Sequence, residues 1–80
     1  MDFKQTYFNL WAEAWNFHKK YATPGDSEEF WEQLVNESGE IMKEYEDKPE
    51  CDFVKDLVVA IVAEIERVSK RQRKEDKNDG

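Results

Sequence analysis

The feature that most constrains this chain is a segment between residues 54 and 68 whose apolar residues cover nearly the whole circumference of a helix. One stripe recurs at steps of three and four residues, which is the spacing of a helix. It consists of Val54, Leu57, Ile61, Ile65 and Val68. Most residues between positions 58 and 63 are apolar as well. A helix that is apolar nearly all round belongs in the centre of a structure, so we expect other helices or another chain to cover it.

Two more helices are expected before this segment, separated by residues that break helices. Pro24 and Gly25 end the first, and Pro49 follows the second. The sequence therefore predicts helices over about 2–21, 27–46 and 52–70, in an all-α three-helix bundle with the third helix most buried. We expect a single domain over residues 1–68 and a charged, frayed or disordered tail over 69–80, which carries no apolar residue.

Three local features refine these boundaries. Asp26 is the expected N-cap of the second helix, with Glu29 at the spacing of a capping box. Asp52 is the expected cap of the third helix. Gly39 lies inside the second helix, where glycine costs about 1 kcal/mol relative to alanine. We therefore expect close packing or a local irregularity at Gly39.

Apolar surface exceeds what so short a chain is expected to bury. Eighty residues bury a modest core, and seven of the eleven aromatic residues fall in the first predicted helix. Two other helices can cover only part of the third one. We therefore predict a homodimer or higher oligomer that forms through the apolar surface left uncovered. The expected apolar interaction surface consists of Phe8, Trp11, Trp15, Val58, Val59 and Val62.

Three features of the sequence favour a cytoplasmic protein. Cys51 is the only cysteine, so no disulfide can form within the chain, and a reducing compartment fits best. The first residues lack the charged region and apolar run of a signal peptide. The longest apolar run, 57–63, is too short to cross a bilayer. We therefore expect no association with a membrane.

The negative charge is concentrated in the middle of the chain. Residues 21–52 carry eleven acidic side chains against two lysines, which gives this segment a net charge of −9. Direct binding of nucleic acid is not expected, because phosphate requires basic surface. The expected acidic face of the second helix consists of Glu28, Glu29, Glu32, Glu37, Glu40 and Glu44. Such a face serves solubility, or it mimics a phosphate backbone and blocks a basic groove.

Most familiar catalytic chemistry finds no support in the sequence. One histidine and one cysteine exclude a zinc-finger pattern, and the three glycines stand too far apart to form a phosphate-binding loop. His18 has no visible nucleophilic partner. We therefore predict a non-catalytic protein–protein interaction protein without a cofactor, whose partner is a second copy or another protein.

Two pairs of carboxylates leave an enzymatic alternative open. Glu37 and Glu40 are three residues apart, and Asp52 and Asp56 are four apart, so each pair shares a helix face. Facing each other, the pairs would offer oxygen ligands for Mg²⁺. The segments 37–41 and 55–58 resemble the MazG-type all-α nucleotide pyrophosphohydrolases. That resemblance implies Mg²⁺-dependent hydrolysis, but the pattern is incomplete because Phe53 stands where the family has a glutamate.

A second resemblance covers more of the chain. The segments Glu29–Leu34 and Phe53–Arg67 resemble short helical proteins of phages and conjugative elements in Gram-positive bacteria. This resemblance implies an accessory role in a mobile element. Within that role, a phosphate-mimicking acidic face would act as an inhibitor of a host defence protein that binds nucleic acid.

Overall fold

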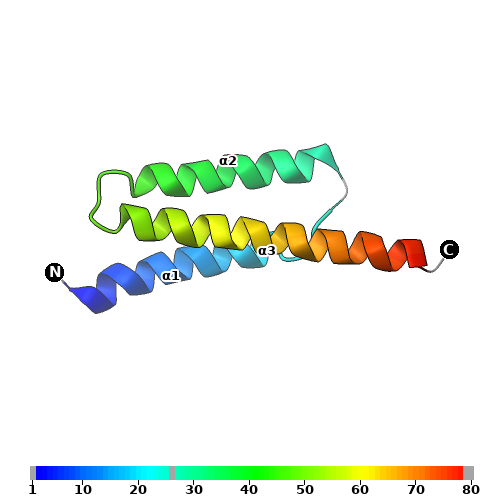
Figure 1. The fold of residues 1–80 in the computed structure, drawn as a ribbon. Helices are drawn as coiled ribbons and strands as arrows, with labels where there is room; N and C mark the ends of the chain where they lie inside the picture. The colour runs from blue at the N-terminus through cyan, green and yellow to red at the C-terminus, as the bar shows by residue number, and fades with distance from the viewer. Residues whose placement is uncertain (1, 26, 79–80) are drawn as a thin grey trace.

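The chain folds into a bundle of three helices. The computed structural model describes the backbone of residues 2–25 and 27–78, and the side chains of those residues up to Gln72. These residues form α1 (Phe3–Lys20), α2 (Glu28–Glu44) and α3 (Cys51–Asn78), with no strand among them. Successive helices run antiparallel, and α1 and α2 both pack on α3 (Figure 1). The all-α three-helix bundle predicted from the sequence is confirmed.

Short polar side chains cap the first two helices. Asp2 accepts a hydrogen bond from the backbone amide of Gln5, and Ser27 accepts one from that of Phe30, each at 3.2 Å. The prediction of Asp26 as the second cap is wrong, because Ser27 occupies that position; Asp26 itself lies outside the described residues. The observed cap places Phe30, and not Glu29, at the position that a capping box requires.

A tight turn joins α2 to α3. The Lys48 amide donates to the carbonyl of Tyr45 at 3.0 Å, and the Cys51 amide donates to the carbonyl of Lys48 at 3.1 Å. Helix α3 therefore begins at Cys51. Asp52, predicted as its cap, lies instead in its first turn, where a carboxylate still favours the positive end of the helix.

Helix α3 is longer than the sequence predicts. It continues to Asn78 and projects beyond the other two helices (Figure 1). The expected tail is therefore helical over residues 69–78, and residues 79–80 lie outside the description. The helix continues past its last apolar residue because this segment is rich in lysine, arginine, glutamine and glutamate, which are good helix formers. Glu64 adds ion pairs to Arg67 at 2.8 Å and to Arg71 at 3.5 Å.

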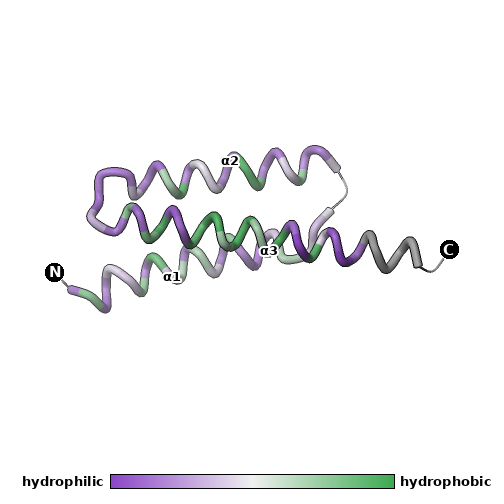
Figure 2. Tube along the Cα trace, viewed as in Figure 1, coloured by the Kyte–Doolittle hydropathy of each residue, from purple (hydrophilic) through white to green (hydrophobic). Residues whose placement is uncertain are grey.

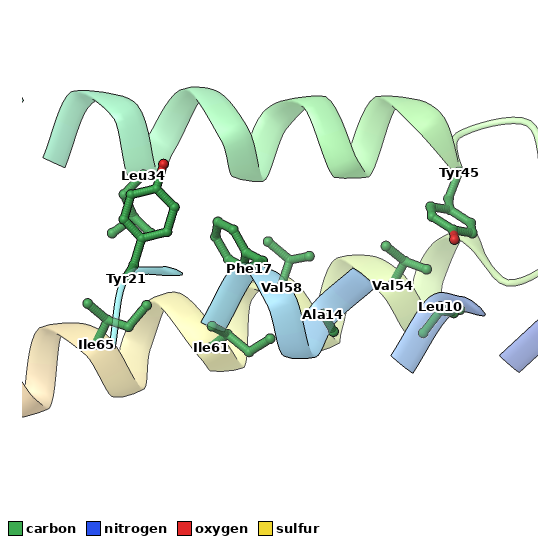
Figure 3. Packing of buried hydrophobic residues seen from close by; sticks show 10 residues of the cluster. All are labelled: Leu10, Ala14, Phe17, Tyr21, Leu34, Tyr45, Val54, Val58, Ile61 and Ile65. Atoms are coloured by element: carbon green, nitrogen blue, oxygen red, sulfur yellow. The ribbon is translucent and has the colours of Figure 1, made fainter. Parts of the chain in front are cut away.

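The core lies where the three helices meet (Figure 3). Its side chains come from all three helices and from Tyr21 and Tyr45, the C-cap residues of α1 and α2. They are Leu10, Ala14, Phe17, Tyr21, Leu34, Tyr45, Val54, Val58, Ile61 and Ile65. Figure 2 shows the hydrophobic residues of α3 gathered in its first half, alongside the other helices. The greater burial of the third helix stays a prediction, because its last side chains are not described.

Gly39 occupies an open position on α2. It is exposed, and a Cβ added there would meet no atom within 4 Å. The expectation of close packing at Gly39 is therefore wrong. Over the residues that the structure describes, no helix combines the length and the apolar character needed to cross a membrane.

We expect Gly39→Ala to stabilise the protein by about 1 kcal/mol, because alanine restricts the unfolded chain and meets no neighbour in the folded one. Urea unfolding followed by circular dichroism measures this gain. An unchanged or lower midpoint would show that the backbone at Gly39 departs from regular helix.

Candidate interaction surface

Helix α1 carries large aromatic side chains on its solvent side. Phe8 is 67% exposed, Trp11 53% and Trp15 66%. These residues follow one another at steps of three and four, so they form a single stripe beside the buried one. The structure thus places these three predicted interaction residues at the surface of the single chain.

Two further rings extend this stripe. Phe53, from the first turns of α3, lies 5.7 Å from Trp11 and 5.8 Å from Tyr7 between ring centroids, both edge to face. Phe3 stacks on Tyr7 at 4.6 Å and stays 68% exposed. We call the five exposed rings the aromatic face. It consists of Phe3, Phe8, Trp11, Trp15 and Phe53.

Phe3 and Phe53 were not predicted as interaction residues. Phe3 belongs to the stripe that is buried further along α1, but it lies at the end of the bundle, where α1 reaches past the turn between α2 and α3 (Figure 1). Phe53 directly precedes the apolar stripe of α3, and its 39% exposure depends on how far α1 covers it. An aromatic residue one position before a buried stripe is a usable sequence signal for such an edge position.

The valines predicted as interaction residues do not share one environment. Val58 is 1% exposed and belongs to the core, so its prediction as apolar surface is wrong. Val59 is 56% exposed, and Val62 is half-buried. Both line a shallow groove of about 240 Å³ between α2 and α3, together with Ser38 and Met42. This groove is separate from the aromatic face, which lies over α1 and the start of α3.

The six glutamates of α2 do not form one face. Glu28 and Glu37 are nine positions apart, which places them about 180° apart around a helix. Glu37, Glu40 and Glu44 line a hollow of about 330 Å³ between α2 and α1. Glu28, Glu29 and Glu32 are exposed near the start of α2. The predicted acidic face is therefore spread around half of the helix.

Two residues of α1, Glu13 and Lys20, form side-chain contacts with α2 and its C-cap at the acidic hollow. The Lys20 Nζ atom lies 2.8 Å from Glu37 Oε1, and this hydrogen bond and charge raise the pKa of Lys20. The Tyr45 hydroxyl donates to Glu13 Oε2 at 2.8 Å. Burial and this hydrogen bond raise the pKa of Tyr45. The sequence offered no signal for the contact between Glu13 and Tyr45, because it joins positions 32 residues apart.

Glu13 and Glu44 repel each other when both are ionised. Hydrogen bonding to Glu13, desolvation and the charge of Glu13 raise the pKa of Glu44 above its ordinary value of 4.5. A raised pKa means that proton binding favours the folded state. That stabilisation is present at acid pH and is lost as the pH rises through the folded-state pKa.

We expect Glu44→Gln to be more stable than the parent at neutral pH, by up to about 0.5 kcal/mol after screening by solvent. The glutamine stays neutral, so it does not repel Glu13, and its amide group is a donor as only the protonated form of Glu44 is. The advantage should shrink at the acid end of a pH series of thermal unfolding. Glu32→Gln removes the same charge at an exposed position of α2, so it is the control. Equal, pH-independent gains in both variants would contradict a specific contact between Glu13 and Glu44.

The carboxylates proposed as Mg²⁺ ligands are not assembled into a site. Glu37 and Glu40 face the hollow next to α1, whereas Asp52 and Asp56 are exposed on α3. Within the described residues, no three His, Cys, Asp or Glu side chains come together in a way that could hold a metal ion. The two carboxylate pairs therefore do not face each other. The residue spacing within each pair determines which side of its own helix the pair occupies, but not how the two helices are oriented.

The described residues define the class of the protein, an all-helical three-helix bundle with an aromatic face open to solvent. No protein-family model matches the chain, and neither a curated protein nor a solved structure matches it. The resemblances to MazG-type enzymes and to helical proteins of mobile elements stay predictions from the sequence.

Proposed function

We propose that this chain is a non-catalytic protein–protein interaction protein that self-associates through its aromatic face. The observation that carries the proposal is the exposure of five aromatic rings along α1 and at the start of α3, where Phe53 contacts Trp11. Aromatic side chains dominate the energetics of protein interfaces and are enriched at their cores. The exposed rings therefore support a role in binding another protein surface.

The size of the chain supports a second copy as the partner. A domain of this length buries a smaller fraction of its surface than larger domains do, and its stability is correspondingly marginal. Covering the aromatic face in a dimer would add apolar burial that the single chain lacks. A two-fold dimer uses the same face on both copies, which is the commonest arrangement of homo-oligomers.

Sedimentation equilibrium at micromolar concentrations tests this proposal, with Trp15→Glu as the disrupting variant. We expect the parent to dimerise and Trp15→Glu to weaken the dimer roughly 30-fold or more, which corresponds to the loss of one hot-spot residue. The exposed position of Trp15 means that the monomer should stay folded, and circular dichroism verifies this.

Val35→Glu is the matched control. Val35 is 62% exposed on α2, so this variant adds the same charge at an exposed apolar position away from the aromatic face. Its dimer should form as in the parent. A strictly monomeric parent would overturn the proposal, and equal weakening by both variants would place the interface elsewhere.

A further inference from the structure

The groove between α2 and α3 is a second apolar surface, separate from the aromatic face. Its lining comes from both helices and includes Met42, Val59 and Val62. Val35 is seven positions before Met42, so it lies on nearly the same side of α2. Val35 is 62% exposed and Val59 is 56% exposed. The rims of the groove therefore carry apolar side chains that the single chain leaves in water.

Oppositely charged residues flank the groove along α3. Lys55 and Glu66 are eleven positions apart, which places them about 20° apart around the helix. Asp52 and Lys70 are 18 positions apart, so they point in the same direction. All four are exposed. Among the side chains that the structure describes, Lys55 and Glu66 form no ion pair.

Helix α2 carries a similar pair in the opposite order along the chain. Glu32 and Lys43 are eleven positions apart, and Glu32 lies about 60° from Val35 around the helix. The two helices run antiparallel (Figure 1), so Glu32 lies at the same end of the groove as Glu66. Lys43 lies at the other end with Lys55. The groove thus has acidic residues near one end and basic residues near the other.

These flanking pairs are centred at one level of the groove. The midpoint of each α3 pair falls at Ile61 or just before it, and the midpoint of the α2 pair falls just before Ser38. Ser38 and Val62 line the same groove, so the midpoints lie within about one helical turn of each other. A single two-fold axis at this level would therefore relate all three pairs.

We infer that two copies of the chain also associate through the α2–α3 groove, about a two-fold axis that crosses both helices at right angles. Such an axis lays each helix antiparallel over its own copy and keeps every side chain on its own side of the helix. Lys55 of one copy then meets Glu66 of the other. In the same way Asp52 meets Lys70, and Glu32 meets Lys43. Each pair forms twice, as in any isologous contact.

The order of the charges selects this axis over the other two-fold arrangement of the same groove. An axis along the helices would lay α2 of one copy over α3 of the other. It would bring Lys43 level with Lys55, and Glu32 level with Glu66. Like charges facing each other across an interface are unfavourable. The charges of the groove are therefore complementary to a second copy in the crossed arrangement alone.

This contact goes beyond the self-association proposed above and is expected to be the weaker of the two. Its exposed apolar surface consists mainly of aliphatic side chains, whereas five rings form the aromatic face. Interfaces with a small footprint are weak and transient. We expect the groove to join copies only at concentrations well above those at which the aromatic face does. With both contacts formed, the assembly is larger than a dimer.

Charge reversals in a Trp15→Glu background test the groove, because that background weakens the contact through the aromatic face. Lys55→Glu and Glu66→Lys should each weaken association roughly tenfold or more, since each turns two attractive pairs into repulsive ones. The double variant Lys55→Glu/Glu66→Lys restores opposite charges at both pairs and keeps the net charge of the background. It should associate as the background does. Sedimentation equilibrium at high protein concentration measures all four proteins.

Lys19→Glu in the same background is the matched control. Lys19 is exposed on α1, so this variant has the same net charge as Lys55→Glu without changing the groove. It should associate as the background does. Circular dichroism verifies that each variant stays folded, which the exposure of these positions leads us to expect.

The outcomes separate the groove from the aromatic face. A Trp15→Glu background that stays monomeric at every concentration, or whose association ignores the charges at positions 55 and 66, overturns the groove as a contact between copies. Stronger association of the single variants would place α2 over α3 and overturn the crossed axis. The proposed function is tested by the unmodified chain at micromolar concentration, so each proposal can fail while the other stands.

Discussion

Val58→Asp is expected to unfold the protein, whereas Val59→Asp is expected to leave it folded. Val58 is 1% exposed in the core, and Val59 next to it is 56% exposed. An unpaired carboxylate at position 58 would be held among apolar side chains such as Val54 and Ile61. Burying an unpaired charge costs several kcal/mol, unless the group takes up a proton or the structure opens.

The stability of a chain of this size makes that cost decisive. At about 0.05–0.15 kcal/mol per residue, the whole fold is worth roughly 4–12 kcal/mol. Circular dichroism should therefore show loss of the cooperative thermal transition in Val58→Asp and its retention in Val59→Asp. Both substitutions change helix propensity equally, so that term cancels. The opposite pattern would show that α3 is rotated relative to the other helices.

Phe17→Ala should destabilise the fold by about 3–5 kcal/mol, because it removes a buried ring and leaves a cavity. Phe17 is 3% exposed, and its ring lies 5.5 Å from that of Tyr21, centroid to centroid. Trp15→Ala on the same helix is the control. Trp15 is 66% exposed, so its removal should change the stability of the monomer by less than about 1 kcal/mol.

Urea unfolding at a concentration below that of dimer formation measures both effects. The contrast between the variants separates the two roles that aromatic residues have on α1. A large loss of stability in the Trp15→Ala monomer would contradict its placement at the surface, and a small loss in Phe17→Ala would contradict the core arrangement of Figure 3.

The two apolar stripes of α1 could be told apart in the sequence, and the expectation that Phe8, Trp11 and Trp15 lie at the surface agrees with their exposure. Periodicity separates Leu10, Ala14 and Phe17 from Phe8, Trp11 and Trp15. Periodicity alone does not say which stripe faces the rest of the chain, because both are apolar, and the expectation rested on the surplus of aromatic residues in this helix. The structure buries the first and leaves the second in water, since α1 has two neighbours that meet on one side of it.

The carboxylates show a different limit of the sequence. Spacing correctly puts Glu37 and Glu40 on one side of α2, but the contacts of that side were not predictable. Lys20 of α1 pairs with Glu37, and Glu13 of α1 lies beside Glu44. These contacts depend on the orientation of two helices and not on local spacing, so neither the ion pair nor the raised pKa of Glu44 was foreseen.

The sequence by itself determined the three helices and the apolar stripes, because helix formation depends on the spacing of apolar residues and on breakers such as Pro24 and Pro49. Only the tertiary structure decided which apolar residues stay in water. Val58 and Val59 are chemically identical neighbours, and a turn of 100° on the helix sends one into the core and the other into solvent. Three helices can cover only the sides that they turn toward one another, so the remaining aromatic surface of α1 stays exposed to solvent.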